Sequence, residues 1–117
     1  MFIDSAAVPK QVQTNVGDKF EVGTAFLPTP GTENNKNIGV IIDGASLWIL
    51  NTRSDKYQKA AWEVIKYSVS PQEQAYWNQH TGYFPVNKDT YNLPEEKAFL
   101  ESHRQFKVAI DQLRSLL

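Results

Sequence analysis

The chain of 117 residues contains no cysteine, no long apolar run and no excess of charge of one sign. Without cysteine it has no disulfide bond, no thiolate metal site and no thiol nucleophile, although cysteine usage does not fix the compartment. No run approaches the roughly 20 apolar residues of a membrane-spanning helix, and residues 1–10 lack the basic and apolar regions of a signal peptide. If the protein is exported, we expect its signal to lie outside this chain.

The charges are nearly balanced, with 12 lysines and arginines against 13 acidic residues and a formal net charge of -1. No basic stripe is visible, which argues against a nucleic-acid partner held by phosphate contacts. The content of 41% hydrophobic residues is that of an ordinary globular protein. A chain of this length can bury roughly 65% of its unfolded surface, so we expect one domain or part of one.

Motifs for catalysis and metal binding are missing as well. His80 and His103 lie far apart and have no carboxylates at metal-ligand spacing. Ser46 is not in a nucleophile elbow, because a tryptophan stands where that motif needs its second glycine. The adjacent Glu95–Glu96 pair suits the first turn of a helix, where carboxylates face the positive end of the dipole. The sequence therefore predicts no enzyme, no metal and no cofactor.

The first half of the chain reads as strands around one helix. Met1–Ile3 is strand-like, and a helix is expected from residue 6 or 7 to about 16, ended by Gly17. Alternation over residues 20–24 predicts a half-buried strand that stops at Pro28.

Residues 29–37 are rich in proline, glycine and asparagine and predict a surface loop. The apolar runs at residues 38–42 and 45–50 predict two more strands. The Asp43–Gly44 pair between them could close a hairpin, or Gly44 could bend one long strand.

From residue 53 the apolar period becomes helical. The first of these helices has Ser54 as a candidate N-cap, and the next follows Ser70, with Pro71 and Glu73 placed for a capping box and Gly82 as its C-cap. One helical turn near Asp89 and two helices at about 94–103 and 104–116 complete the pattern. We expect the core side of the first helix to carry Tyr57, Ala60, Ala61, Val64, Ile65 and Ser68, and we expect Trp62 and Trp77 to be partly core.

Several aromatic residues are candidates for stacking on sugars, whose C–H faces pack on indole and phenol rings. Tyr83 stands out because it follows a helix-ending glycine and lies in a loop, where ligand-binding residues are common. The other candidates are Trp48, Trp62, Tyr76, Trp77 and Phe84.

Four blocks of the sequence resemble, in order and spacing, the C-terminal lobe of family 1 extracellular solute-binding proteins of ABC importers. The blocks are FEVGTAFLP (20–28), DGASLWIL (43–50), AAWEVIKYSVSPQEQAYWNQHTGYFPVNK (60–88) and FLESHRQFKVAIDQL (99–113). The chain is most similar to the sugar and glycerol-3-phosphate branch. The resemblance implies an α/β fold of the two-lobed, type II periplasmic-binding-protein class, in which hinge motion closes the lobes around a ligand. Residues 1–117 would be a single C-lobe fragment, with strands, one helix and a loop in 1–52 and helices in 53–117.

The resemblance also implies binding residues at the turn that opens DGASLWIL. The family turn is usually Gly-Gly, and its backbone and the residues after it approach the ligand. Gly44 matches this pattern, Ala45 and Ser46 follow it, and Asp43 departs from it. A carboxylate at position 43 would accept sugar hydroxyls or clash with a phosphate, which favours a neutral carbohydrate. Trp48 matches a family tryptophan that belongs either to the lobe core or to the cleft wall.

Two further residues carry over from the family pattern. Tyr83 in TGYFP matches a tyrosine that lines the cleft. Ser5 in DSAA matches a helix start whose amides and hydroxyl face the cleft, an arrangement suited to anions and hydroxyl groups.

The resulting expectation is a binding module that captures a carbohydrate outside the cytoplasm and delivers it to ABC permease subunits in the membrane, without catalysis. It would be periplasmic or lipid-anchored. The alternatives are glycerol-3-phosphate or glycerophosphodiester binding in the same fold and, less favoured, a carbohydrate-active enzyme domain in which Asp43 acts with a glutamate. Exposed apolar patches and unpaired sheet edges on such a fragment predict self-association.

Overall fold

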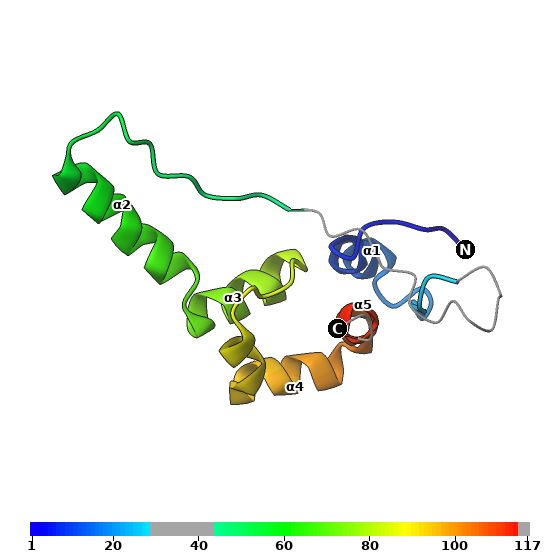
Figure 1. Cartoon of the computed structure of the whole chain (residues 1–117). Coiled ribbons are helices and arrows are strands. Elements are labelled where there is room, and N and C mark those ends of the chain that lie inside the picture. Colours follow the sequence, from blue (N-terminus) through cyan, green and yellow to red (C-terminus); the bar gives the residue numbers. More distant parts are fainter. Residues whose placement is uncertain (29–43, 115–117) are drawn as a thin grey trace, which may run out of the picture.

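A computed structural model describes residues 1–28 and 44–114 of the chain. In chain order its helices are α1 (Val8–Val16), α2 (Asp55–Ser68), α3 (Pro71–Thr81), the short 3₁₀ helix η1 (Lys88–Asn92), α4 (Pro94–Ser102) and α5 (Arg104–Arg114). Figure 1 shows α3, η1, α4 and α5 gathered together, with α1 close to α5 and α2 projecting away.

The helices lie where the sequence predicts them, because their ends are specified locally. α1 has a proline in its first turn and ends at Gly17, and α3 begins with Pro71 after Ser70. The capping box itself does not form, since the Ser70 side chain makes no cap hydrogen bond. Glu73 instead accepts a hydrogen bond of 2.5 Å from the Tyr67 hydroxyl. The boundary at Ser70 was therefore correct, and the proposed side-chain bonding was wrong.

The predicted strands do not form in the described residues. Residues 1–28 and 44–114 contain no strand, so Met1–Ile3, residues 20–24 and residues 45–50 are irregular. The strand expected at 38–42 and the loop at 29–37 lie outside the described residues. A strand exists only when a neighbouring strand takes up its backbone hydrogen bonds, and no such neighbour lies beside these segments in the described parts of the chain.

One of these segments is held by side chains in place of a neighbouring strand. The Gln105 side chain donates to the Val22 carbonyl oxygen at 2.9 Å, and the Leu27 amide donates to the Gln112 side chain at 3.1 Å. Gln105 and Gln112 are seven positions apart, which is two helical turns, so both side chains leave α5 on the same side. Residues 22–27 therefore run alongside α5.

The core is small and lies between α3, η1, α4 and α5. Its buried apolar residues among those described are Ala75, Phe106 and Ile110. The Phe106 ring packs edge-on against Phe99 at 5.2 Å between centroids, and Phe99 stacks on His103 at 4.4 Å. These contacts join the end of α4 to the start of α5.

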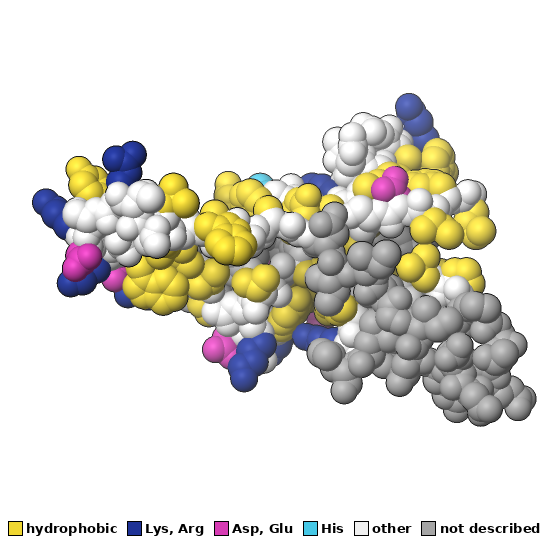
Figure 2. All heavy atoms as spheres, turned by 45° about the horizontal axis from the view of Figure 1, so that its top comes forward, with side chains coloured by type: hydrophobic (Ala, Val, Ile, Leu, Met, Phe, Trp, Pro, Cys, Tyr) yellow, Lys and Arg dark blue, Asp and Glu magenta, His cyan; other side chains and the backbone are white. Residues whose placement is uncertain are grey.

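α2 contributes little to that core. None of its residues is buried, so the face expected to point inward is only partly covered. Trp62 is 52% exposed and Trp77 is 54% exposed, so each of these two residues, expected to be partly core, is covered over only about half of its surface. Figure 2 shows hydrophobic side chains exposed on the described part of the face in view. The radius of gyration is 17.4 Å, whereas a compact chain of this length has about 13 Å.

Candidate functional site

The structure brings the start of α1 against the end of α3, where two of the predicted binding residues lie. Gly82 follows α3 with φ of 82°, and a Cβ atom placed on it would lie 3.0 Å from the Ala7 carbonyl oxygen. The same atom would lie 3.3 Å from the Phe106 ring. Only glycine combines this left-handed backbone with so close an approach. The contact places Ser5 and Tyr83 in one neighbourhood although they lie far apart in the sequence.

Ser5 lies in the turn before α1, two residues ahead of the Ala7 N-cap. Its hydroxyl oxygen accepts from the Ala7 amide at 3.4 Å, and its carbonyl accepts from the Val8 amide at 3.0 Å. The first turn of α1 carries no acidic residue, so no carboxylate of the helix itself neutralises the positive end of the helix dipole. Asp4 is the nearest carboxylate in sequence, and it accepts from the Ser5 amide at 2.7 Å.

Tyr83 has a fixed backbone and an accessible ring. Its carbonyl accepts from the buried Asn78 side chain at 2.9 Å, and its amide donates to the Thr81 hydroxyl at 3.3 Å. The side chain is 50% exposed. Sequence reasoning missed Asn78. The sequence pattern that could have indicated Asn78 is a polar residue four positions before the C-cap glycine, and this pattern is weak evidence without the fold.

The predicted turn is not assembled with these two residues. Asp43 lies outside the described residues. Ala45 and Ser46 are exposed, and the Ser46 hydroxyl accepts from the Trp48 indole N–H at 2.8 Å. Trp48 is 83% exposed and therefore packs in no core in the part of the chain that is described. No hydrogen bond or ring contact of the described residues joins Ala45, Ser46 or Trp48 to Ser5 or Tyr83.

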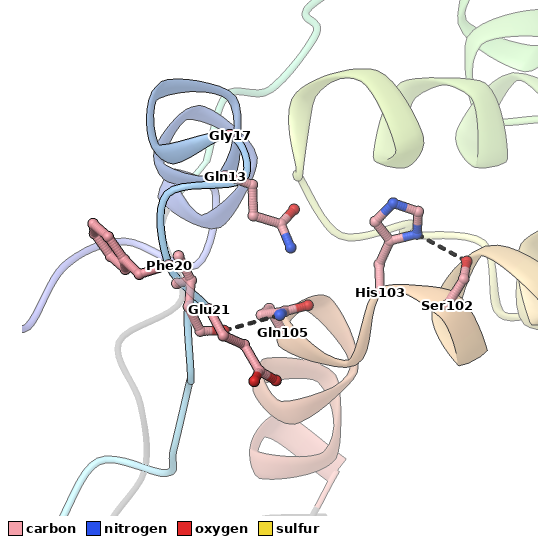
Figure 3. A pocket seen from close by; sticks show the side chains of 8 residues that line it. Gln13, Gly17, Phe20, Glu21, Ser102, His103 and Gln105 are labelled. Carbon is pink, nitrogen blue, oxygen red and sulfur yellow. Dashed lines mark hydrogen bonds between the residues drawn. The ribbon is translucent and has the colours of Figure 1, made fainter.

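A separate hollow of ≈ 340 Å³ lies between α1, residues 20–22 and the junction of α4 with α5. Figure 3 shows Gln13 and His103 extending into the space between these elements, whereas the Phe20 ring points away. The Nδ1 atom of His103 lies 2.9 Å from the Ser102 hydroxyl and 3.0 Å from the Phe99 carbonyl. The lining comes from three distant segments, so no local pattern could have revealed it.

The described residues hold one buried carboxyl group. Glu96 is 0% exposed in the first turn of α4, and its Oε2 atom accepts from the Gln79 side chain at 3.1 Å. Burial raises the pKa of Glu96, the neighbouring Glu95 charge raises it further, and the hydrogen bond from Gln79 opposes the shift. Its Oε1 atom is buried without a partner, as are Asn78 Oδ1 and Thr90 Oγ1. These polar atoms are buried and present nothing to a ligand.

Across 1–28 and 44–114, no group of three or more histidine or acidic side chains is arranged to hold a metal ion. No helix in this part of the chain is long and apolar enough to cross a membrane.

Comparison with known proteins gives a consistent result. The family described as "Bacterial extracellular solute-binding protein" matches residues 1–106. A relative named sn-glycerol-3-phosphate-binding periplasmic protein UgpB, from Yersinia pestis, is 33% identical over 95 residues, which is 81% of this chain and 22% of the relative. The protein of the same name from Escherichia coli O6:H1 is 28% identical over 95 residues, again 81% of this chain and 22% of the relative. The chain thus spans about a fifth of the length of these relatives. No solved structure matches.

Proposed function

This chain belongs to the bacterial extracellular solute-binding proteins, and we propose that it forms part of a ligand cleft that captures a small solute for uptake by an ABC importer. In this proposal the protein acts outside the cytoplasm, closes around its ligand and docks on permease subunits. It performs no reaction, in keeping with the absence of a catalytic constellation from its sequence.

The observation that carries the proposal is the contact between Ala7 and Gly82. It unites a helix N-terminus, a serine hydroxyl and an accessible tyrosine ring on neighbouring parts of the molecule. Helix amides and hydroxyls bind the oxygen atoms of a ligand, and a phenol ring stacks on its C–H face. Ser5 and Tyr83 are therefore the residues to which we assign binding first.

We further propose that Gly44, Ala45, Ser46 and Trp48 join this site when the cleft closes. They are exposed in the structure, so they are accessible to a ligand or to another part of a complete cleft. Asp43, which precedes them, would accept hydroxyl hydrogen bonds in that arrangement. These assignments rest on the family pattern.

A neutral carbohydrate is the ligand that we propose, and glycerol-3-phosphate is the second candidate. Asp43 favours the neutral ligand, because a carboxylate repels a phosphate at close range. Two observations favour the second candidate: the name of the relatives, and the lack of acidic residues in the first turn of α1. The positive end of that helix dipole would attract a phosphate, although Asp4 lies next to it and the Ala7 and Val8 amides already donate to Ser5.

Calorimetric titration of the full-length protein against a panel of sugars and glycerol phosphate esters tests the proposal. We expect heat with at least one ligand, and Tyr83→Ala should weaken that binding about tenfold, the equivalent of about 1.4 kcal/mol. Tyr57→Ala is the matched control, because Tyr57 is a tyrosine on α2 that is even more exposed than Tyr83, and its loss should leave affinity unchanged. A folded protein that responds to no member of the panel would contradict the proposed function.

A further inference from the structure

The segment that follows α3 is held by side chains of α3 itself. The Asn78 side chain donates to the Tyr83 carbonyl oxygen at 2.9 Å, and the Tyr83 amide donates to the Thr81 hydroxyl at 3.3 Å. Farther along the segment, the Val86 amide donates to the Gln74 side chain at 2.9 Å. Residues 82–86 belong to no helix or strand, so their backbone groups need other partners, and these side chains supply them.

The three side chains of α3 that make these bonds share one face of the helix, because successive members are four and three positions apart. Tyr83 is bonded near the end of α3, and Val86 is bonded near its beginning. Asn87 then donates to the carbonyl oxygen of Val69, just ahead of the helix, at 2.9 Å. Residues 83–87 therefore run back along α3 toward η1, as Figure 1 shows.

Asn78 is poorly suited to a purely structural role. Its side chain is fully buried, and its Oδ1 atom has no hydrogen-bond partner among the described residues. A buried acceptor without a donor costs stability, and an apolar side chain at this position would avoid that cost. What the asparagine provides, and an apolar residue could not, is the hydrogen bond to the Tyr83 carbonyl oxygen.

We propose that Asn78 and Thr81 are positioning residues for Tyr83, which they hold so that its ring is in place before a ligand arrives. This role rests on the proposed function, in which the Tyr83 ring contacts the ligand. Both backbone polar groups of Tyr83 are bonded to α3, so the ring keeps only its side-chain rotations. A ligand that meets a ring on a fixed backbone has less disorder to remove, which raises its affinity.

Calorimetric titration of full-length variants tests this role, with the sugar or glycerol phosphate ester that gives heat with the unaltered protein. Asn78→Ala removes both the donor and the unpartnered acceptor, and it should weaken binding about three- to tenfold, because the ligand must then order Tyr83 itself. Thr90→Ala is the matched control. Thr90 is equally buried and its hydroxyl oxygen also lacks a partner among the described residues, so it makes no side-chain bond to the Tyr83 segment, and its loss should leave affinity unchanged.

A second pair of variants changes a residue that is only partly buried, so it does not depend on a core substitution. Thr81→Val removes the acceptor of the Tyr83 amide and should also weaken binding, whereas Thr81→Ser keeps the hydroxyl and should bind like the unaltered protein. In the ligand-free protein, the Tyr83 amide should exchange its hydrogen faster in Thr81→Val than in Thr81→Ser. Equal exchange in these two variants would overturn the proposal.

A double-mutant cycle separates positioning from general loosening of the fold. Once Tyr83→Ala has removed the ring, Asn78→Ala should weaken binding no further, because the two residues act through the same contact. An undiminished effect of Asn78→Ala in that background would overturn the positioning role, as would equal losses in Asn78→Ala and Thr90→Ala. Binding that depends on Tyr83 but tolerates both Asn78→Ala and Thr81→Val would overturn this role alone. A folded protein that binds no member of the panel would contradict the proposed function, and the positioning role would fall with it.

Discussion

Replacing Glu96 by glutamine should stabilise the protein at neutral pH. The carboxyl group is fully buried, and only its Oε2 atom has a partner, the Gln79 side chain at 3.1 Å. The buried acceptors Asn78 Oδ1 and Glu96 Oε1 lack donors, and Thr90 Oγ1 is also unpartnered. An ionised carboxylate has no hydrogen to donate from its buried Oε1 side, whereas a protonated carboxyl group or a glutamine amide has one.

The sign of the pH dependence follows from the direction of the pKa shift. Burial raises the pKa of Glu96 above its ordinary value of 4.5 in the folded protein. Its contribution to stability is therefore fully present below that value and is lost as the pH rises through the folded pKa. The free energy of unfolding should accordingly fall as the pH rises above 4.5 in the unaltered protein, and the Glu96→Gln variant should lack this part of the slope.

Two effects of opposite sign set the size of the change. A buried polar atom without a hydrogen bond costs about 1–3 kcal/mol, and removing the charge relieves much of that cost. A carboxylate in the first turn of a helix gains about 0.3–1 kcal/mol from the dipole, which the variant loses. The first effect is larger, so we expect a net gain of about 1–2 kcal/mol at pH 7 and almost none at pH 4.

Urea unfolding followed by helical circular dichroism at both pH values measures this change. Glu95→Gln is the matched control, because Glu95 adjoins Glu96 in the same helical turn and is exposed. It loses the same charge without the burial, so it should be neutral or slightly destabilising. A Glu96→Gln variant that is less stable than the unaltered protein at pH 7, or that keeps the same pH slope, would refute the reasoning.

Two further substitutions test the packing that positions the site. Gly82→Ala should destabilise the fold by at least about 1–2 kcal/mol, because it places a Cβ at positive φ and 3.0 Å from a backbone oxygen. Gly23→Ala, where no atom lies within 4 Å, should have little effect, and equal losses in thermal unfolding would contradict the contact. Phe106→Ala should cost about 3–5 kcal/mol in denaturant unfolding because the side chain is buried, whereas Phe20→Ala on the surface should cost little; comparable costs would count against the core described here.

The helices could be predicted from the sequence because their signals are local. Pro71 and Gly82 mark the ends of α3 through backbone preferences that hold whatever surrounds them. The strands could not be confirmed, since a strand depends on partners that no local pattern supplies. Residues 20–24 show the difference: their alternation is that of a strand, yet in the structure Gln105 takes up a hydrogen bond that a neighbouring strand would otherwise make.

For a related reason, the sequence could predict only part of the candidate site. A family pattern can indicate Ser5 and Tyr83 singly, but only the fold shows that Gly82 brings α1 and α3 together. Trp62 and Trp77 were expected to be partly core, and about half of each stays exposed, because hydrophobic periodicity identifies the side of a helix that can be buried. It does not show whether anything covers that side.

The two halves of the proposed site should contribute to affinity in different ways. Tyr83 is held by buried Asn78 and follows Gly82 in the best-packed part of the molecule, so its ring is positioned before a ligand arrives. Residues 44–48 are exposed and lie outside any helix or strand, and ordering each of them costs about 1–2 kcal/mol of backbone entropy. Contacts made by that turn must offset this cost before they add to binding. Affinity should therefore depend more on Tyr83 than on Trp48, even though Trp48 has the larger and more exposed ring.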